Sequence, residues 1–285
     1  MRKGFLGTLV ASGILLAPAP QARATTWLPP ARPLTADETL DLAVSESDAV
    51  AVGNVVAIRD TIVDMVGGTG IPSRSLALHV TELLSGAVPG IDLAVGVSPA
   101  DDASQYAELL ARPELRSRQA LFFLRRSPSG WVFREYPDPP SLQLPPPEAL
   151  AAAVAGVRRA VARQSPDSLL ARADLVVLGS RGPLDSRCAE TGVVRECATV
   201  TVREVLAGPA APESLRVTSA VVGHMPAGDA VYVLRRLRDG LYETVGFRSG
   251  SLSVRDGRVE RWGLSVDEVR GKAERARAAR PRSGR

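Results

Sequence analysis

Cysteine, histidine and aromatic residues are scarce in this 285-residue chain, which holds two cysteines, two histidines and 4% aromatic residues. A structural zinc site takes about four cysteine, histidine or carboxylate ligands, so two cysteines without histidine partners exclude it. Asp101 and Asp102 stand together at the start of an expected helix, where carboxylates favour the helix dipole. No acidic pair is singled out by its context. We therefore expect no metal, no cofactor and no catalytic residue, and a protein that is not an enzyme.

Lysine is nearly absent as well, because only Lys3 and Lys272 occur and arginine supplies the remaining positive charge. The formal net charge is +4, and it falls to +1 without the first 24 residues. Residues 270–285 carry seven basic groups against Glu274 alone, so residues 25–269 have a net charge of −5. The high pI belongs to this C-terminal tail, expected to be a solvated helix end, and not to a nucleic-acid-binding surface. We expect no nucleic acid partner.

The chain also lacks a long apolar run, since crossing a bilayer takes about 20 consecutive apolar residues. The run from Gly4 to Leu16 is shorter, follows Arg2 and Lys3, and precedes the small-x-small sequence Ala22-Arg23-Ala24. These are the features of a secretory signal peptide. No cysteine follows that could carry a lipid anchor. We expect residues 1–24 to be removed and the protein to be exported to a bacterial periplasm or beyond, with no membrane span.

Three motifs occur twice in the same order, and the offset between the copies falls from 126 to 122 to 110 residues. This spacing is longer than the ~20–50 residues of solenoid and propeller repeats, so each copy is expected to be a domain. The predicted organisation is residues 34–164, residues 165–269 and a basic helix end or tail at 270–285. The matching pairs are Asp48–Gly53 with Asp174–Gly179, Glu82–Gly86 with Glu204–Gly208, and Ala120–Arg126 with Ala230–Arg236.

Each copy is predicted to contain five short strands with a helix on either side. Regular strand–helix alternation is missing, so the pattern favours small antiparallel barrels or sandwiches over a parallel α/β sheet. Capping boxes start the first and last helices, and an Asp-Gly turn at 256–257 predicts a hairpin. The expected strands are 49–58, 75–84, 91–97, 121–124 and 131–133, then 174–180, 198–206, 214–221, 230–236 and 241–247; the expected helices are 36–45, 101–118, 148–163, 167–172 and one after Ser265.

Cys188 and Cys197 flank a stretch that should join two strands of the second copy. In an oxidising compartment we expect them to form a structural disulfide, worth roughly 2–3 kcal/mol through the loop that it closes. A redox role would favour a Cys-x-x-Cys motif, which is absent.

The two histidines offer little catalytic chemistry. His79 is expected on the outer face of a strand, and the second copy has Thr201 in its place. His224 lies in a loop near Asp229, and a hydrolase using it stays an alternative although no Gly-x-Ser-x-Gly motif is present. Two arginine pairs, at 125–126 and 235–236, recur at strand ends, where they form either an anion-binding patch or solvated strand termini.

The order of Asp174–Gly179, Val202–Gly208 and Ala227–Leu234 resembles that of netrin-like domains, the family that includes the tissue inhibitors of metalloproteinases. The resemblance covers most of each copy through short motifs and implies two tandem OB-like five-stranded antiparallel barrels with flanking helices. It does not carry the inhibitory activity over, because those inhibitors use an N-terminal cysteine that this chain lacks near Thr25.

We therefore predict an exported, non-enzymatic binding or protein-interaction module with an envelope or extracellular protein as the candidate partner. OB barrels bind ligands through loops between strands, which here predicts Asp60–Arg74 and Gly182–Glu196. A protease inhibitor acting through these loops is the alternative. The candidate interaction loop is Glu190, Thr191, Gly192, Val193, Val194 and Arg195.

Overall fold

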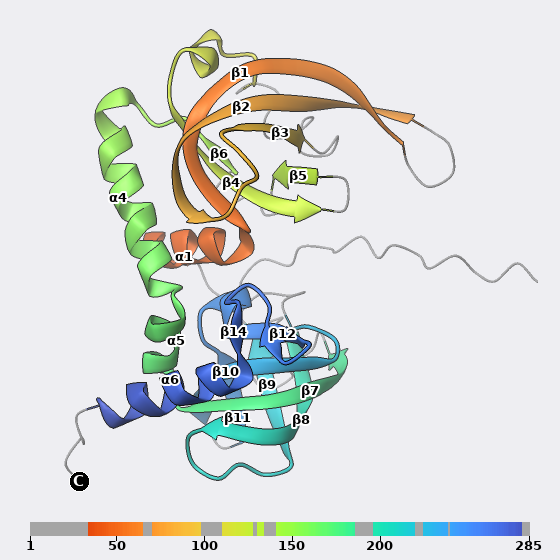
Figure 1. Cartoon of the computed structure of the whole chain (residues 1–285), viewed down its shortest axis with the longest axis vertical. Helices are drawn as coiled ribbons and strands as arrows, with labels where there is room; N and C mark the ends of the chain where they lie inside the picture. Colours follow the sequence, from red (N-terminus) through yellow and green to blue (C-terminus); the bar gives the residue numbers. More distant parts are fainter. Residues whose placement is uncertain are drawn as a thin grey trace, which may run out of the picture.

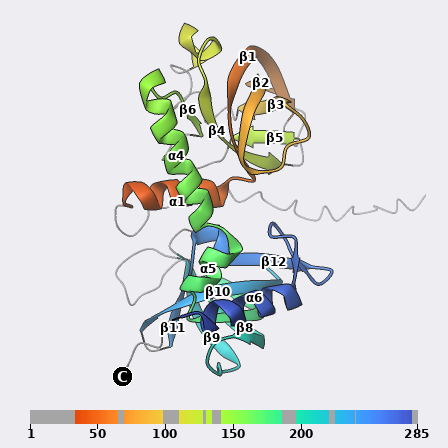
Figure 2. The same ribbon diagram turned by 60° about the vertical axis from the view of Figure 1, so that its left-hand side comes forward.

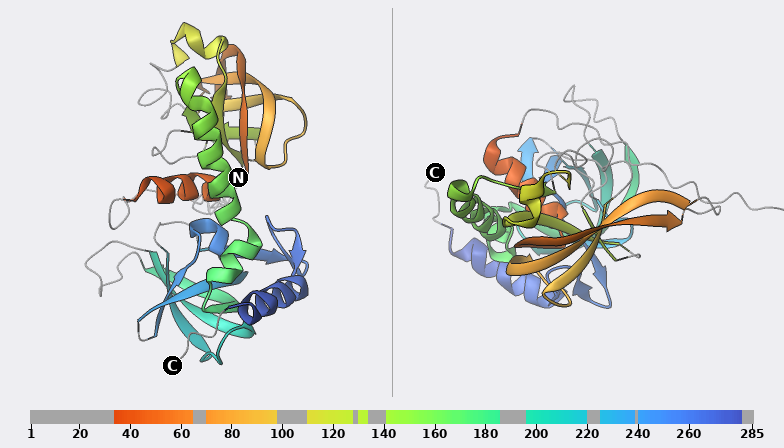
Figure 3. Two further views of the ribbon diagram at one scale, coloured as in Figure 1. Left: turned by 90° about the vertical axis from the view of Figure 1, so that its left-hand side faces the viewer. Right: turned by 90° about the horizontal axis from the view of Figure 1, so that it is seen from above.

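A computed structural model describes residues 34–64, 70–97, 110–127, 130–133, 141–185, 196–219, 225–238 and 240–280. These residues form two lobes that follow one another along the long axis of the molecule, each built on a β-barrel (Figure 1; Figure 3, left). The expected signal peptide, residues 1–24, lies outside the described residues.

The first barrel closes in the strand order β1-β2-β3-β5-β4 with a return pairing between β1 and β4. All its pairings are antiparallel except β3 with β5, which is parallel. A short sixth strand pairs with β4 outside the closed ring. The strands are β1 (Ala49–Asp64), β2 (Gly70–Gly86), β3 (Asp92–Val97), β4 (Ala120–Ser127), β5 (Gly130–Phe133) and β6 (Leu142–Gln143).

The second barrel repeats this topology as β7-β8-β9-β11-β10, closed between β10 and β7, again with one parallel pair, β9 with β11. Three further strands extend the sheet beyond β10. The predicted fold class, mainly β with two tandem OB-like barrels, is confirmed. The strands are β7 (Leu175–Asp185), β8 (Glu196–Ala207), β9 (Ser214–Ser219), β10 (Asp229–Arg238), β11 (Leu241–Thr244), β12 (Ser251–Arg255), β13 (Arg258–Val259) and β14 (Leu264–Ser265).

The repeated aspartate has the same structural role in both barrels. The carboxylate of Asp48 accepts a hydrogen bond of 2.8 Å from the backbone N–H of Arg126, and the carboxylate of Asp174 accepts one of 2.9 Å from that of Arg236. Each aspartate therefore ties the start of a barrel's first strand to its fourth.

The repeated glycine has a steric cause. A Cβ at Gly53 would clash with the carbonyl oxygen of His79, and a Cβ at Gly179 would clash with that of Thr201. Both glycines lie at a register shift between the first two strands of their barrel. A bulge at this position brings the two backbones too close together for a side chain.

Helices cover one side of each barrel. Figure 1 shows α4 running beside the first barrel and leading into α5 beside the second, while α1 crosses below the first barrel (see also Figure 2). Both predicted capping boxes are present, at the starts of α1 and α6. The helices are α1 (Ala36–Glu46), η2 (Pro113–Arg116), α4 (Pro147–Arg163), α5 (Pro166–Arg172), η3 (Phe247–Gly250) and α6 (Val266–Ala278), where η denotes a 3-10 helix.

The apolar runs of the central strands are continuous because both faces of these strands are buried. In β1, Ala49 and Ala51 face the barrel interior, whereas Val50 and Val52 pack in a second cluster with helix residues such as Val157. A strand covered on both faces loses the alternation of polar and apolar residues that marks a half-exposed strand.

Several predicted elements need correction. Of the predicted helix over 101–118, residues 101–109 lie outside the described part and residue 110 is α-helical. Past it, Pro113–Arg116 form the 3-10 helix η2, because Pro113 cannot continue α-helical hydrogen bonding. The predicted loop at 60–74 is largely strand, since β1 and β2 stay paired out to Asp64 and Gly70. The predicted strand at 241–247 ends at Thr244, because Gly246 adopts a φ of +78° and η3 follows.

Part of the basic segment contacts the second barrel, whereas Arg275 and Arg277 are exposed as predicted and residues 281–285 lie outside the described residues. Arg270 bonds to Glu204 at 2.5 Å and also pairs with Asp267, and Lys272 bonds to Asp167 at 2.8 Å. Residues 270–278 form the last part of α6, which packs against the second barrel.

Candidate functional site: the cleft between the barrels

A cleft of about 1200 Å³ lies where the two barrels meet. The first copy supplies Val44 of α1, Asp48 just before β1, the end of β2 and the hairpin of β4 and β5. The second supplies η3, β12 and the turn after β13. The junction of α4 and α5 completes the wall with Gln164, Ser165 and Pro166. The cleft is therefore made by both copies and by the connector between them.

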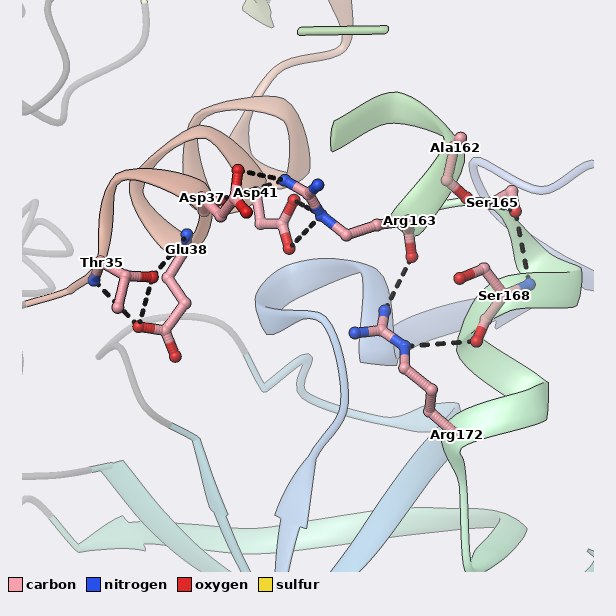
Figure 4. Close-up of polar contacts among 9 residues, drawn as sticks. All are labelled: Thr35, Asp37, Glu38, Asp41, Ala162, Arg163, Ser165, Ser168 and Arg172. Carbon is pink, nitrogen blue, oxygen red and sulfur yellow. Dashed lines mark hydrogen bonds and ion pairs between the residues drawn. The ribbon is translucent and has the colours of Figure 1, made fainter. Parts of the chain in front are cut away.

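Charged side chains hold this junction in place (Figure 4). The Nε of Arg163, the last residue of α4, donates to both carboxylate oxygens of Asp41 in α1, at 2.8 and 3.1 Å. Arg172, at the end of α5, donates to the carbonyl oxygens of Arg163, at 2.7 Å, and Ser168, at 3.3 Å. The ends of α4 and α5 and the middle of α1 are thus fixed around the residue that follows Arg163.

The ion pair at this junction is partly desolvated. Burial raises the pKa of Asp41 above its ordinary value, although the hydrogen bond and the charge of Arg163 act in the opposite direction. Burial also lowers the pKa of Arg172, while the charge of Asp41 opposes that shift. These shifts are expected where charges leave water and are stabilised by each other.

Gln164 is the most unusual residue of the cleft wall. Its backbone N–H ends α4 by donating to the carbonyl oxygens of Ala160 and Val161, at 3.0 and 3.1 Å. Its side chain is 8% exposed, yet neither its Nε2 nor its Oε1 has a hydrogen-bond partner. A Cβ at Gly246 would lie 2.9 Å from Gln164 Oε1, so the amide reaches the second barrel.

Arg248 and Asp48 meet across the cleft. The Nη1 of Arg248, in η3, lies 3.9 Å from the Oδ1 of Asp48, and this Nη1 is buried with no hydrogen-bond partner. The other carboxylate oxygen of Asp48 accepts from the backbone N–H of Arg126. The pair is therefore close enough for charge attraction but too far apart for a hydrogen bond.

Arg261, one of the residues that line the cleft, joins the barrels. Much of its surface is exposed, but its guanidinium reaches the end of α1 and donates to the carbonyl oxygens of Val44, at 2.8 Å, Ser47, at 2.6 Å, and Ser45. Desolvation of the guanidinium, followed by the nearby charge of Arg248, lowers the pKa of Arg261 to about 10. The group therefore remains a cation at neutral pH.

The described lining is cationic and also carries hydroxyl and indole groups. It holds five arginines against two carboxylates, those of Asp48 and Glu260. The Nε of Arg255 lies 3.3 Å from the Oε1 of Glu260. The guanidinium carbon of Arg126 lies 5.8 Å from the ring centre of Trp131. Trp262 and five serines complete this chemistry. The arrangement can hold a negatively charged, hydrogen-bonding molecule.

The residues singled out from the sequence lie mostly elsewhere. His79 is on β2, with its side chain 44% exposed and its Nδ1 2.8 Å from the Oδ1 of Asp92, and it does not line the cleft. His224, Cys188 and the candidate interaction loop at 190–195 lie outside the described residues. Cys197 is buried at the start of β8, and its pairing with Cys188 stays a prediction.

The two recurring arginine pairs have different locations and partners. Arg125 and Arg126 line the cleft, while Arg235 bonds to Glu243 at 2.7 Å in the second barrel.

No sequence signal identified Gln164, Arg248 or Arg261. Within the described ranges, no group of three histidine, cysteine, aspartate or glutamate residues could hold a metal ion.

Comparisons with known proteins leave the family open. No family model matches the chain, and no curated protein matches it. Among solved structures, it matches that of a murine DNA-binding protein bound with double-stranded DNA, with 10% identity over 71% of this chain and 95% of the other. The TM-score of 0.21 is too low to bear on fold or function. The netrin-like resemblance gains no support and stays a hypothesis.

No helix in the described ranges is long and apolar enough to cross a bilayer.

Proposed function

We propose that this chain is a non-enzymatic binding module and that its ligand enters the cleft between the two barrels. The observation that carries this proposal is the buried amide of Gln164, whose donor and acceptor atoms both lack partners in the cleft wall. Buried polar atoms in proteins are nearly always hydrogen-bonded, because leaving one unpaired costs about 1–3 kcal/mol. A polar ligand that bonds to this amide would recover that free energy.

The buried Nη1 of Arg248 supports the same location, because it also lacks a hydrogen-bond partner. The described lining holds arginines, serines and tryptophans, with no histidine or cysteine among them. Such a lining suits recognition better than proton transfer, which most often uses histidine. Export and an envelope or extracellular protein partner stay predictions from the sequence.

A Gln164→Leu variant tests the proposal. Leucine removes the two unpaired polar atoms, so we expect the free energy of unfolding of the ligand-free protein to rise by about 1 kcal/mol. We also expect the variant to lose any ligand found by a thermal-shift screen of small polar molecules against the wild-type protein. Urea unfolding and titration calorimetry measure the two effects.

Gln119→Leu is the matched control, because Gln119 is exposed, bonds to Thr81 at 3.1 Å and lies outside the cleft. It should leave ligand binding unchanged. If Gln164→Leu binds the ligand as tightly as the wild-type protein, the proposed site is wrong, and a loss of stability in the same variant would identify the amide as a structural group.

A further inference from the structure

The described lining combines three kinds of chemistry that one class of ligand would use together. Resting on the function proposed above, we propose that the cleft binds an acidic sugar, a hydroxylated ring that carries a carboxylate or a phosphate group. The arginines would bind the acidic group, the amide and hydroxyl groups would bind the ring hydroxyls, and the indole rings would pack against the C–H face of the ring.

The charge of the cleft opposes that of the domains around it. Residues 25–269 have a net charge of −5, whereas the cleft lining has three more arginines than carboxylates. Because clefts with low-dielectric walls focus the field of their lining charges, this cationic cleft in an acidic body favours entry of an anion.

Two of these arginines already have partners in the protein. Arg261 donates to carbonyl oxygens of α1, and Arg255 pairs with Glu260.

Arg248 is the best placed of these cations to bind the acidic group. It is 3.9 Å from Asp48, so the pairing is loose, and its Nη1 is buried without a hydrogen bond. A guanidinium in this state can form charge-assisted hydrogen bonds with a carboxylate or phosphate, which are stronger than bonds between neutral groups.

Uncharged polar groups of the lining match a ligand with several hydroxyls. Gln164 offers an unpaired donor and an unpaired acceptor, and a sugar hydroxyl can satisfy either one. Ser249, 2% exposed, and Ser253 add hydroxyl groups on the wall formed by the second barrel. A simple inorganic anion would have no donor for the acceptor Oε1 of Gln164 unless it were protonated.

Two of the chain's three tryptophans, Trp131 and Trp262, line the cleft, one from each barrel. Both are partly buried against the barrel cores, so their rings are held in place. Ligand pockets typically measure about 300–1,000 Å³, so a cleft of about 1200 Å³ can hold a molecule larger than one sugar ring.

The test uses the full chain and four probes: glucuronic acid, glucose 6-phosphate, glucose and inorganic phosphate. Titration calorimetry and tryptophan fluorescence follow each addition. We expect saturable binding and a fluorescence change with at least one of the two acidic sugars, and at least about tenfold weaker binding of glucose and phosphate, since each lacks one set of contacts.

Two variants link binding to the cleft. Arg248→Ala should weaken acidic-sugar binding by about tenfold or more, because a hydrogen bond to a charged group is lost. Arg159→Ala removes the same charge from an exposed residue of α4 outside the cleft and should change the affinity by less than about twofold. Far-UV circular dichroism checks that both variants are folded.

The outcomes separate the two proposals. If neither acidic sugar binds, or if glucose or phosphate binds equally well, the assignment to acidic sugars is overturned. The same holds if acidic sugars bind and Arg248→Ala binds them as tightly as Arg159→Ala does. The proposed function itself fails only when ligands from the wider screen bind Gln164→Leu as tightly as the wild-type protein.

Discussion

Tyr232 shows how one residue can differ between two copies of the same fold. It is fully buried inside the second barrel, and its hydroxyl has no hydrogen-bond partner. Burial raises the pKa of Tyr232 to about 12, helped by the nearby charge of Glu196 and opposed by that of Arg181, so the phenol stays neutral at physiological pH. At the matching position the first barrel has Phe122, which is also fully buried.

We expect Tyr232→Phe to leave the free energy of unfolding unchanged or to raise it by up to about 1 kcal/mol, because the change removes an unpaired buried hydroxyl without altering the ring. Urea unfolding at neutral pH measures the effect. Tyr242→Phe, at a half-buried tyrosine of the same barrel, is the control. A loss of more than about 1 kcal/mol for Tyr232→Phe would mean that its hydroxyl makes a stabilising bond in solution.

At the scale of single elements, the start of α6 depends on one capping carboxylate. Glu268 accepts a bond of 2.7 Å from the backbone N–H of Ser265, whose hydroxyl accepts from the N–H of Glu268 at 3.1 Å. The bonds from the backbone and the side chain of Ser265 lower the pKa of Glu268 below its ordinary value of 4.5. The deprotonated form is therefore the one that the fold favours.

Because the pKa of Glu268 is lower in the folded state, its contribution to stability is complete above about pH 4.5 and is lost as the pH falls through the lowered value. We expect Glu268→Gln to reduce the drop in unfolding midpoint between neutral and acidic pH. Urea unfolding at several pH values tests this, with the exposed Glu274→Gln of the same helix as control. An equal acid-induced drop in wild type and Glu268→Gln would contradict the prediction.

A second element-scale feature recurs in both copies. Arg261 donates to the carbonyl oxygens at the end of α1, and Arg280 donates to those of Ala171 and Ala173 at the end of α5. Each helix leads into the first strand of its barrel. In the second copy the capping arginine follows α6 of the same barrel, whereas in the first copy it comes from the other barrel.

At the scale of the whole molecule, Arg261 makes the stability of the helix that leads into the first barrel depend on the second barrel. We expect Arg261→Ala to lower the free energy of unfolding by about 1–2 kcal/mol, because it leaves carbonyl oxygens of the buried residues Val44, Ser45 and Ser47 without a charged donor. The loss of this tie should also let the barrels separate, which small-angle X-ray scattering would record as a larger radius of gyration.

Arg280→Ala is the matched control for this change, since it removes a similar cap within one barrel. It should lower the stability and leave the radius of gyration unchanged. If Arg261→Ala and Arg280→Ala give the same scattering profile as the wild type, Arg261 does not hold the two barrels together.

The features that depend on near neighbours along the chain could be predicted from the sequence alone. The capping boxes at Thr35 and Ser265 need residues only three positions apart, and the Asp256-Gly257 turn needs two residues with positive φ. The duplicated aspartates and glycines could also be recognised in the sequence, because the same contacts at the strands need the same residues in each copy. The strand pattern of the two copies predicted small antiparallel barrels or sandwiches, and the resemblance to netrin-like domains implied that these are OB-like.

The position of the cleft and the residues that line it depend on contacts between distant parts of the chain. Gln164, Arg248 and Arg261 belong to no repeated motif, and Arg261 bonds to carbonyl groups 214 to 217 residues away. Sequence periodicity reports which faces of nearby elements are apolar, but not how two finished barrels pack on each other. That packing depends on the fit of two folded surfaces, and it brings five arginines together within residues 25–269, whose net charge is −5.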